Sequence, residues 1–256
     1  MFLYSVIFIF GSIIGSFLNC LSWRLKNRKK FVLTRSQCPK CGIELKWWEN
    51  VPILSFLGLR GKCRYCEVKI PLNYFLTELF SGLLFVWVFW FNSGSNIIGL
   101  DLIKIFLEFF IVSILLFVFL HDILYKEILP GAIWLGLGVV LVYQFFLQTD
   151  IGGIFWGAVL GFGFFAFQYF ISKGRWIGGG DVRFGFLMGA LLGVKKIIVA
   201  LLFAYWFGAL VGVLLIIFKK RKMGSEIPFG TFLAVGTILA MYYGEYIIRW
   251  YMNIIS

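Results

Sequence analysis

Charged residues are scarce in this 256-residue sequence, because Asp, Glu, Lys and Arg make up only 14% of it while hydrophobic residues make up 61%. A chain so poor in charge is not an ordinary water-soluble domain. Apolar runs that approach or exceed the roughly 18 residues of a membrane-spanning helix recur along the chain. The sequence therefore predicts an all-α polytopic membrane protein.

Acidic residues are particularly few, since 12 Asp and Glu stand against 24 Lys and Arg, for a net charge of +12. In a soluble protein this excess would suggest nucleic-acid binding, but the sequence contains no aromatic-stacking module for nucleic acid. In a membrane protein the excess is expected in cytoplasmic loops, next to anionic lipid headgroups. Membrane lipids, and no nucleic acid, are therefore the predicted partners.

Three other features are missing. The first apolar segment has no basic region before it and no small-residue cleavage site after it, which favours a retained helix over a cleaved signal peptide. No Ser or Cys lies in a recognisable nucleophile elbow, so the sequence does not indicate an acyl-enzyme hydrolase. No glycine-rich strand-to-helix turn is present, so a Rossmann nucleotide site is not expected.

About eight apolar segments are expected to be transmembrane helices: 2–22, 73–91, 102–121, 128–147, 151–171, 182–193, 196–218 and 229–250. The sixth is short, and a re-entrant segment is the alternative there. An N-terminus outside the cell places most Lys and Arg in the cytoplasm, including the cluster Lys219-Lys220-Arg221-Lys222. The same orientation places Asp122 and Asp181 at cytoplasmic helix ends.

One small cytoplasmic insert is expected at residues 23–72, between a first helix at 1–22 and a helical core at 73–256. It carries two Cys-x-x-Cys pairs, Cys38 with Cys41 and Cys63 with Cys66. Two such pairs can complete a closed, structural zinc site. Disulfides are the alternative, which a cytoplasmic location disfavours. Because about fifty residues bury little core, zinc is expected to supply much of the folding energy of this zinc ribbon.

Two aspartates, Asp122 and Asp181, lie beside long apolar runs, where a carboxylate is costly and is usually retained for chemistry. Asp181 follows Gly178, Gly179 and Gly180, which leave room for another backbone to approach. Such a pair suggests a dyad that activates water. The alternative is two independent interfacial carboxylates, each paired with a nearby basic residue.

Several short motifs occur in a fixed order: Gly15-Ser16-Phe17-Leu18-Asn19, the two cysteine pairs, Glu49-Asn50-Val51-Pro52-Ile53-Leu54-Ser55, the Asp122 region ending in Leu129-Pro130, Gly178-Gly179-Gly180-Asp181-Val182 and Ile227-Pro228-Phe229-Gly230. Together they resemble the bacterial type IV prepilin peptidase family over nearly the full length. By this resemblance, Asp181 corresponds to the aspartate of the GxGD motif and Asp122 to its partner. One departure is that Asp122 lies eight residues before Pro130, where the family usually has seven.

The resemblance implies an intramembrane aspartic endopeptidase of the bacterial inner membrane. Such an enzyme removes the basic leader of prepilins or pseudopilins after a glycine, on the cytoplasmic side. Many members also methylate the new N-terminal amine with S-adenosylmethionine. Asn19, Glu49, Asn50 and Glu78 are the candidates for contact with the methyl donor or for polar support. For all four, support of the fold is the alternative.

Two polar residues have simpler expected roles. The single histidine, His121, is expected to be an interfacial residue rather than a ligand, although beside Asp122 it could tune the dyad. Glu108 has no counterpart in the family, and Lys104 four residues earlier explains it as one half of a helix ion pair.

Two other classes of function remain as alternatives. One is a proton- or ion-coupled transporter that uses the two aspartates, although the sequence shows no inverted repeat and places both at one face. The other is a non-enzymatic scaffold for pilus or secretion assembly that recruits a partner through the zinc ribbon. The sequence does not identify the pilin substrate or the oligomeric state.

Overall fold

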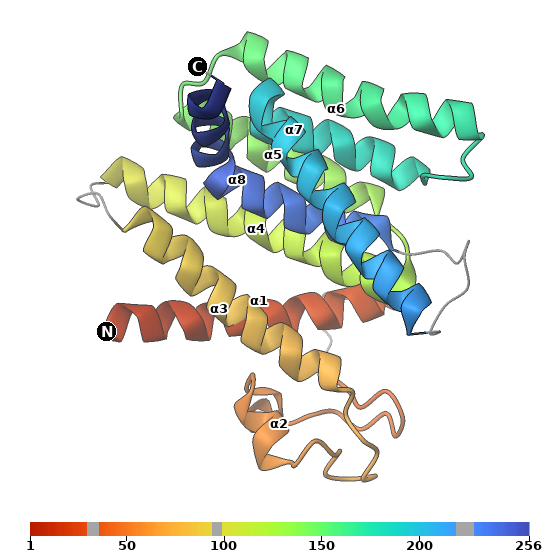
Figure 1. Ribbon diagram of the computed structural model, residues 1–256. Helices are drawn as coiled ribbons and strands as arrows, with labels where there is room; N and C mark the ends of the chain where they lie inside the picture. Colours follow the sequence, from red (N-terminus) through yellow and green to blue (C-terminus); the bar gives the residue numbers. More distant parts are fainter. Residues whose placement is uncertain (30–35, 94–98, 219–227, 256) are drawn as a thin grey trace. The chain divides into compact units, whose positions relative to one another are not determined.

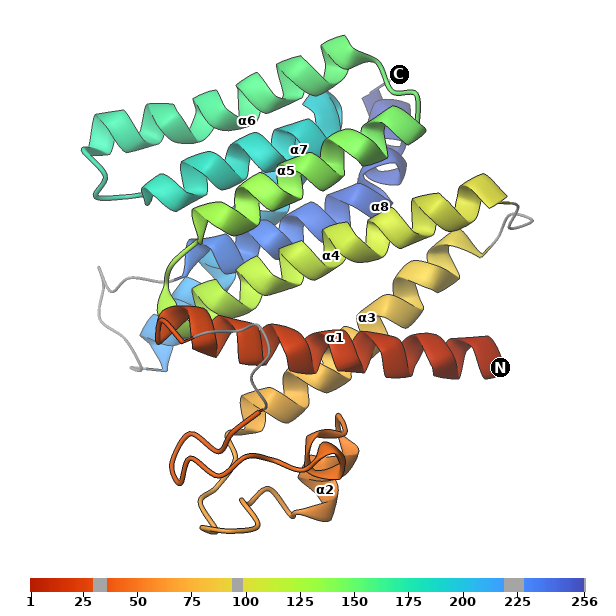
Figure 2. The same ribbon diagram turned by 180° about the vertical axis from the view of Figure 1, so that it is seen from behind.

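The protein is almost entirely helical in the computed structural model, which describes residues 1–29, 36–93, 99–218 and 228–255 (Figures 1 and 2). The basic cluster at 219–222 and Ile227 of the last motif lie outside the described residues. The chain divides into two compact units, Met1–Ile98 and Gly99–Ser256.

Unit 1 consists of two long helices and a small insert between them. The helices are α1 (Phe2–Lys26) and α3 (Leu72–Asn92), and the insert contains the 3₁₀ helix η1 (Trp47–Asn50) and the short α2 (Leu54–Gly58). The two long helices approach closely because small residues line their contact. A Cβ atom at Gly15 would lie 2.7 Å from Cβ of Ser81, and the Ser81 hydroxyl donates to the Gly11 carbonyl at 2.6 Å. Such contacts are typical of helix pairs in membranes.

Unit 2 is a bundle of five helices: α4 (Gly99–Tyr125), α5 (Pro130–Phe146), α6 (Ile151–Ser172), α7 (Gly179–Ile217) and α8 (Phe229–Ile255). Its core contains fully buried aromatic and aliphatic side chains such as Phe165, Phe184 and Leu233. Helices α6 and α7 are in backbone contact, since a Cβ added at Gly157 or Gly161 would collide with the carbonyl oxygens of Gly189 and Gly185. Glycine is therefore required along this seam.

The helix α7 is broken at Gly193. It counts 39 residues, and Gly193 has φ 66° and ψ 179°, which no helical residue adopts. A straight helix of that length would measure roughly 58 Å, about twice the thickness of a bilayer core. The chain instead turns back at the break, so that α7 has two limbs (Figures 1 and 2). The predicted segments 182–193 and 196–218 correspond to these limbs.

The predicted number of eight spans is not confirmed. Six described helices are long and apolar enough to cross a membrane, and α7 counts once among them despite its break. The apolar α5 is shorter than the usual span, with 17 residues. The all-α polytopic class is confirmed, whereas the count depends on how the two limbs of α7 and the short α5 lie in the bilayer.

The connections of unit 2 place four helix ends at one side of the bundle. The C-terminus of α4, the start of α5, the start of α7 and the start of α8 all lie there, at the right in Figure 1 and at the left in Figure 2. Asp122 belongs to the last turn of α4 and Asp181 to the first turn of α7. The fold therefore brings both aspartates to the same end of unit 2.

Candidate functional site

Asp122 is buried and held by the N-terminus of another helix. Its side chain is 5% exposed. Its Oδ2 accepts hydrogen bonds from the backbone N–H of Thr231 at 2.8 Å and from the Thr231 hydroxyl at 3.2 Å. Thr231 lies in the first turn of α8, where N–H groups lack partners within the helix and attract a negative charge. The start of α8 thus stabilises and orients the Asp122 carboxylate.

Asp181 is held in a similar way by the start of its own helix. Its side chain is 8% exposed, and its Oδ2 accepts a hydrogen bond from the Gly178 N–H at 3.0 Å. Gly178 is the residue that precedes the first turn of α7. The carboxylate therefore caps the helix on which it lies, and its rotation is restricted.

Ile128 joins the two sides of this site. A Cβ atom at Gly180 would lie 2.9 Å from the Ile128 Cβ, and a Cβ atom at Gly230 would lie 2.7 Å from the Ile128 Cδ1 and 3.0 Å from Oδ2 of Asp122. The α4–α5 connection, the start of α7 and the start of α8 are thus in contact. Asp122 and Asp181 lie near enough to interact electrostatically.

The three glycines before Asp181 have different surroundings. Gly178 supplies the N–H group that Asp181 accepts, and Gly180 packs against Ile128. A Cβ atom at Gly179 would meet nothing within 4 Å. Of the three, Gly179 leaves open space in which another backbone could lie.

His121 is buried rather than placed at an aqueous interface. Its ring stacks on Phe117 with centroids 5.6 Å apart and is tilted against Tyr125 at 4.9 Å. All three residues belong to α4. The aromatic contacts explain the ring position without a ligand.

Sequence reasoning did not assign the residues around Asp122. Thr231 donates to its carboxylate, Gly230 lies beside it, and Ile128 packs against Gly230. The motif ending in Phe229-Gly230 coincides with the start of the expected helix 229–250, and this was the usable signal. A helix start is an anion site by virtue of its free N–H groups. Only the fold shows which carboxylate occupies it, because Asp122 and Thr231 are 109 residues apart in the sequence.

The four cysteines of unit 1 form one cluster. Their sulfur atoms lie within 4.8 Å of one another, and those of Cys38 and Cys66 are 3.8 Å apart. Four sulfurs at about 2.3 Å from a tetrahedral zinc ion would be about 3.8 Å apart, so the cluster fits this metal. All cysteines of the chain are free thiols, which disagrees with a disulfide framework. Burial opposes ionisation of Cys38, but backbone hydrogen bonds from Cys41 and Lys40 outweigh it and lower the pKa of this thiol to about 7.

Both cysteine pairs have the same local backbone. Each lies in a turn closed by an isolated β-bridge, Gln37 with Glu44 and Lys62 with Lys69. The residue after each second cysteine, Gly42 or Glu67, is left-handed, with φ of 71° and 55°. The repeated turn explains how two separate short sequences present paired thiols to one point.

A cavity of about 420 Å³ lies in unit 1, between the insert and the ends of α1 and α3. Three of the four residues predicted to support a methyl donor line it, namely Glu49, Asn50 and Glu78. Asn19 does not line the cavity, although its side chain is buried on α1. The volume is within the range of about 300–1,000 Å³ that is usual for small-molecule sites.

Buried carboxylates hold the backbone around this cavity. Glu78 Oε2 accepts the N–H of Ile53 at 2.7 Å. Ile53 has φ 65° and ψ −54°, and the Leu54 N–H donates to the Pro52 carbonyl at 2.6 Å, which together describe a γ-turn. A branched side chain at positive φ is strained, and such strain is concentrated at functional sites.

Glu49 is held from three directions. Its Oε2 accepts the Lys46 N–H at 3.0 Å and the Tyr65 hydroxyl at 3.4 Å, and its Oε1 lies 3.7 Å from Nη1 of Arg64. The side chain is buried, whereas that of Arg64 is largely exposed. Both Glu49 and Glu78 therefore bring carboxyl groups into the wall of the cavity, which also contains the basic residues Arg24, Lys29, Arg64 and Lys69.

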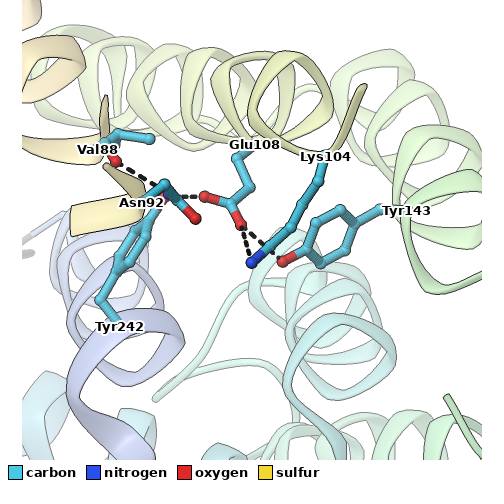
Figure 3. A network of polar contacts seen from close by, with 6 residues as sticks. All are labelled: Val88, Asn92, Lys104, Glu108, Tyr143 and Tyr242. Carbon is cyan, nitrogen blue, oxygen red and sulfur yellow. Dashed lines mark hydrogen bonds and ion pairs between the residues drawn. The ribbon is translucent and has the colours of Figure 1, made fainter. Parts of the chain in front are cut away.

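A separate polar cluster lies inside unit 2, around Glu108. Its two carboxylate oxygens accept hydrogen bonds from the hydroxyls of Tyr143 at 2.9 Å and Tyr242 at 3.0 Å (Figure 3). The predicted pairing with Lys104 is present, with 3.8 Å between Nζ and Oε1. The two tyrosines, from α5 and α8, were not predicted. They make Glu108 a connector of three helices rather than only one half of a helix pair.

Comparison with known proteins gives a consistent result. Residues 9–92 match the family model described as "Bacterial Peptidase A24 N-terminal domain", and residues 109–213 match "Type IV leader peptidase family". A protein of Bacillus subtilis (strain 168) is 32% identical over 97% of this chain and 98% of its own length. A protein of Pseudomonas putida is 31% identical over 93% and 89%, and one of Legionella pneumophila 28% over 98% and 95%. All three are named prepilin leader peptidase/N-methyltransferase. No solved structure matches the chain.

Proposed function

Because the chain belongs to the type IV leader peptidase family, we propose that it cleaves the leader from prepilins or pseudopilins and methylates the new N-terminus. The peptidase proposal is supported by the position of two buried carboxylates, Asp122 and Asp181, at the same end of unit 2 and near enough to interact electrostatically. The alternatives of an ion-coupled transporter and of a scaffold are not favoured by this family membership.

The peptidase reaction follows from the chemistry of adjacent carboxylates. Two such groups cannot both be ionised at close range, so one of them holds a proton. The ionised member takes a proton from water as the water oxygen attacks the scissile carbonyl carbon. The protonated member donates to the carbonyl oxygen, and the C–N bond then breaks as a proton passes to the leaving amine. Asp122 and Asp181 would carry out these steps without a covalent intermediate.

The surrounding residues would position the carboxylates and the substrate. Thr231 and Gly178 each donate to one aspartate and leave its orientation fixed. An extended substrate backbone requires space beside the dyad, and the open side of Gly179 supports an approach there. Gly178 and Gly180 would serve the site through their contacts with Asp181 and Ile128.

The protein is a multi-pass protein of the bacterial inner membrane. Cleavage of a leader in the cytoplasm requires that the two aspartates face that side. We place the N-terminus outside, with the zinc ribbon and both aspartates at the cytoplasmic face. The support is the enrichment of Lys and Arg in the segments that would then face the cytoplasm. The substrate leader would then meet the dyad at the cytoplasmic face, while the apolar helix that follows the leader lies in the bilayer.

The cavity of unit 1 is our proposed site for methyl transfer. S-adenosylmethionine, when bound, supplies an activated methyl group on a positively charged sulfur. Glu49 and Glu78 place buried carboxyl groups in a cavity wall that also contains Arg24, Lys29, Arg64 and Lys69. The wall therefore offers groups of both signs to a ligand that, like S-adenosylmethionine, carries sulfonium, amino and carboxylate groups. Asn50 would add a polar contact. Asn19, which lies outside the wall, would support the fold of α1.

The four thiolates of Cys38, Cys41, Cys63 and Cys66 would hold a structural zinc ion. Four protein ligands complete its coordination, so no position is left for water or substrate. The ion would fix the insert that forms one wall of the cavity, because Cys38 and Cys63 belong to both the cluster and the cavity lining. Zinc would thus serve methylation indirectly.

The test is a reaction of the purified full-length chain with a synthetic prepilin peptide that contains leader, glycine and apolar helix. Mass spectrometry is expected to show release of the leader, and addition of one methyl group only when S-adenosylmethionine is present. A peptide with a bulky residue in place of the glycine serves as control and should stay intact. An uncut wild-type reaction over a range of pH values and detergents would refute the peptidase proposal.

A further inference from the structure

The break in α7 leaves backbone carbonyl groups that need partners. A helix that ends has four C=O groups without intrahelical N–H partners. The first limb of α7 ends just before Gly193, so these groups include the carbonyls of Ala190 and Leu191. In a bilayer core an unpaired carbonyl is costly, and a broken helix is tolerated where a neighbouring helix supplies the missing donors.

Gln144 of α5 supplies donors to both of these carbonyls. Its Nε2 lies 2.9 Å from the Ala190 oxygen and 2.9 Å from the Leu191 oxygen. The side chain is buried. Its Oε1 accepts the Thr149 hydroxyl at 2.9 Å, which orients the amide so that the nitrogen faces α7. Both ends of the amide group therefore have defined partners.

The first limb of α7 carries Asp181 at its other end. From Gly179 to the break it would measure only roughly 20 Å, less than the bilayer core of about 30 Å. Its depth is therefore not set by spanning the membrane. Because the limb is a rigid helix, fixing its end at Gly193 also fixes the position of Asp181 at its other end.

We propose that Gln144 is a positioning residue of the peptidase, which anchors the broken end of α7 and so holds Asp181 level with Asp122. The proposal rests on the proposed peptidase function. Gln144 does not touch the substrate or the dyad. It acts through the first limb of α7, and its loss would misplace one carboxylate relative to the other.

The main test is Gln144→Leu, which removes the donor and keeps a side chain of similar size. A misplacement of about 1 Å in an active site can reduce the rate about 100-fold. We expect kcat for prepilin cleavage to fall about 10- to 100-fold while KM changes less than about 3-fold. Methylation of a peptide without leader, at the proposed site in unit 1, should be unchanged. The thermal unfolding midpoint in detergent should stay close to that of wild type, which shows that unit 2 is folded.

A second variant, Gln144→Glu, keeps size and polarity and guards against a simple folding defect. A protonated carboxyl group can donate one hydrogen bond to a carbonyl, whereas an ionised one repels both. At the most acidic pH at which wild type still cleaves, this variant should retain clearly more activity relative to wild type than Gln144→Leu does. Thermal unfolding midpoints of the two variants at that pH should be similar, so that a difference in cleavage reports positioning rather than general stability.

The matched control is Ser113→Ala, which removes a side-chain hydrogen bond to the Phe109 carbonyl within α4. It should cleave within about 2-fold of wild type. The inference fails if Gln144→Leu also stays within about 2-fold, or if both Gln144 variants lose cleavage and methylation together at every pH. A wild-type chain that does not cleave at all would refute the proposed function instead.

Discussion

The two units hold carboxylates in different ways. In unit 1, Glu49 and Glu78 accept N–H groups from loops and turns of a small insert, whose backbone is shaped by paired cysteines and a strained γ-turn. In unit 2, Asp122 and Asp181 accept N–H groups from the starts of long helices. The first arrangement depends on local turns and on the four-cysteine cluster, and the second on helix packing. The two sites should therefore fail under different perturbations.

The largest effect is expected from the aspartates. Asp122→Asn and Asp181→Asn each remove the acid–base function and should reduce prepilin cleavage by about 10³-fold or more. Methylation of a peptide that already lacks its leader should continue, since its proposed site lies in unit 1. Both rates can be measured on one preparation by mass spectrometry. Cleavage that persists in either variant would remove that aspartate from the mechanism.

Disruption of the four-cysteine site is expected to have the opposite effect, with loss of methylation and retention of cleavage. Cys38→Ser, or removal of zinc by a chelator, should abolish methylation and leave cleavage within a few-fold of wild type. Elemental analysis should find about one zinc per wild-type chain and little in the variant. Cys20→Ser, a change outside the cluster, is the control for zinc content and should keep its zinc; its methylation is not compared, because Cys20 lines the cavity. If both activities survive complete loss of zinc, the ribbon does not serve methylation.

The close contact between α6 and α7 should contribute to the stability of unit 2. Gly161→Ala places a Cβ atom against the carbonyl of Gly185, whereas Gly163→Ala, on the same helix, meets nothing within 4 Å. Overpacking of this kind costs about 1–3 kcal/mol. Thermal unfolding in detergent should show a lower midpoint for the first variant only. Equal midpoints for the two variants would contradict the close α6–α7 contact.

The smallest effect is expected at Glu108. Tyr143→Phe and Tyr242→Phe each remove one hydrogen bond to this carboxylate. Hydrogen bonds between membrane helices are worth about 0.6 kcal/mol on average, so each change should lower stability modestly and leave both activities intact. Denaturant titration of the single and double variants measures this directly. A large loss of either activity would show that Glu108 has a role beyond joining helices.

Local features were predictable from the sequence. The spacing within each cysteine pair is enough to specify a turn that presents two thiols, and the four sulfurs do lie together. The apolar runs correctly predicted a helical membrane protein, because burying backbone polar groups in lipid requires helices. The number of membrane-spanning helices could not be predicted as well, because a glycine in an apolar run does not show whether the chain bends there. At Gly193 it does.

Several contacts of the candidate sites were not predictable. Nothing near Asp122 in the sequence indicates Thr231, and nothing near Gln144 indicates the break in α7. The γ-turn at Ile53 could not be predicted either. Its positive φ favours glycine, but the sequence has a branched residue at this position. Glu78, from a different helix, holds the Ile53 N–H there.

The membrane class, the four-cysteine cluster and the two candidate aspartates of a dyad can all be inferred from the amino-acid sequence. These properties depend on composition or on residues a few positions apart. Only the tertiary structure decided which helix start holds which carboxylate, where α7 turns back and which polar residues line the cavity of unit 1. Those features arise from contacts between distant segments, and such contacts form only when the helices pack.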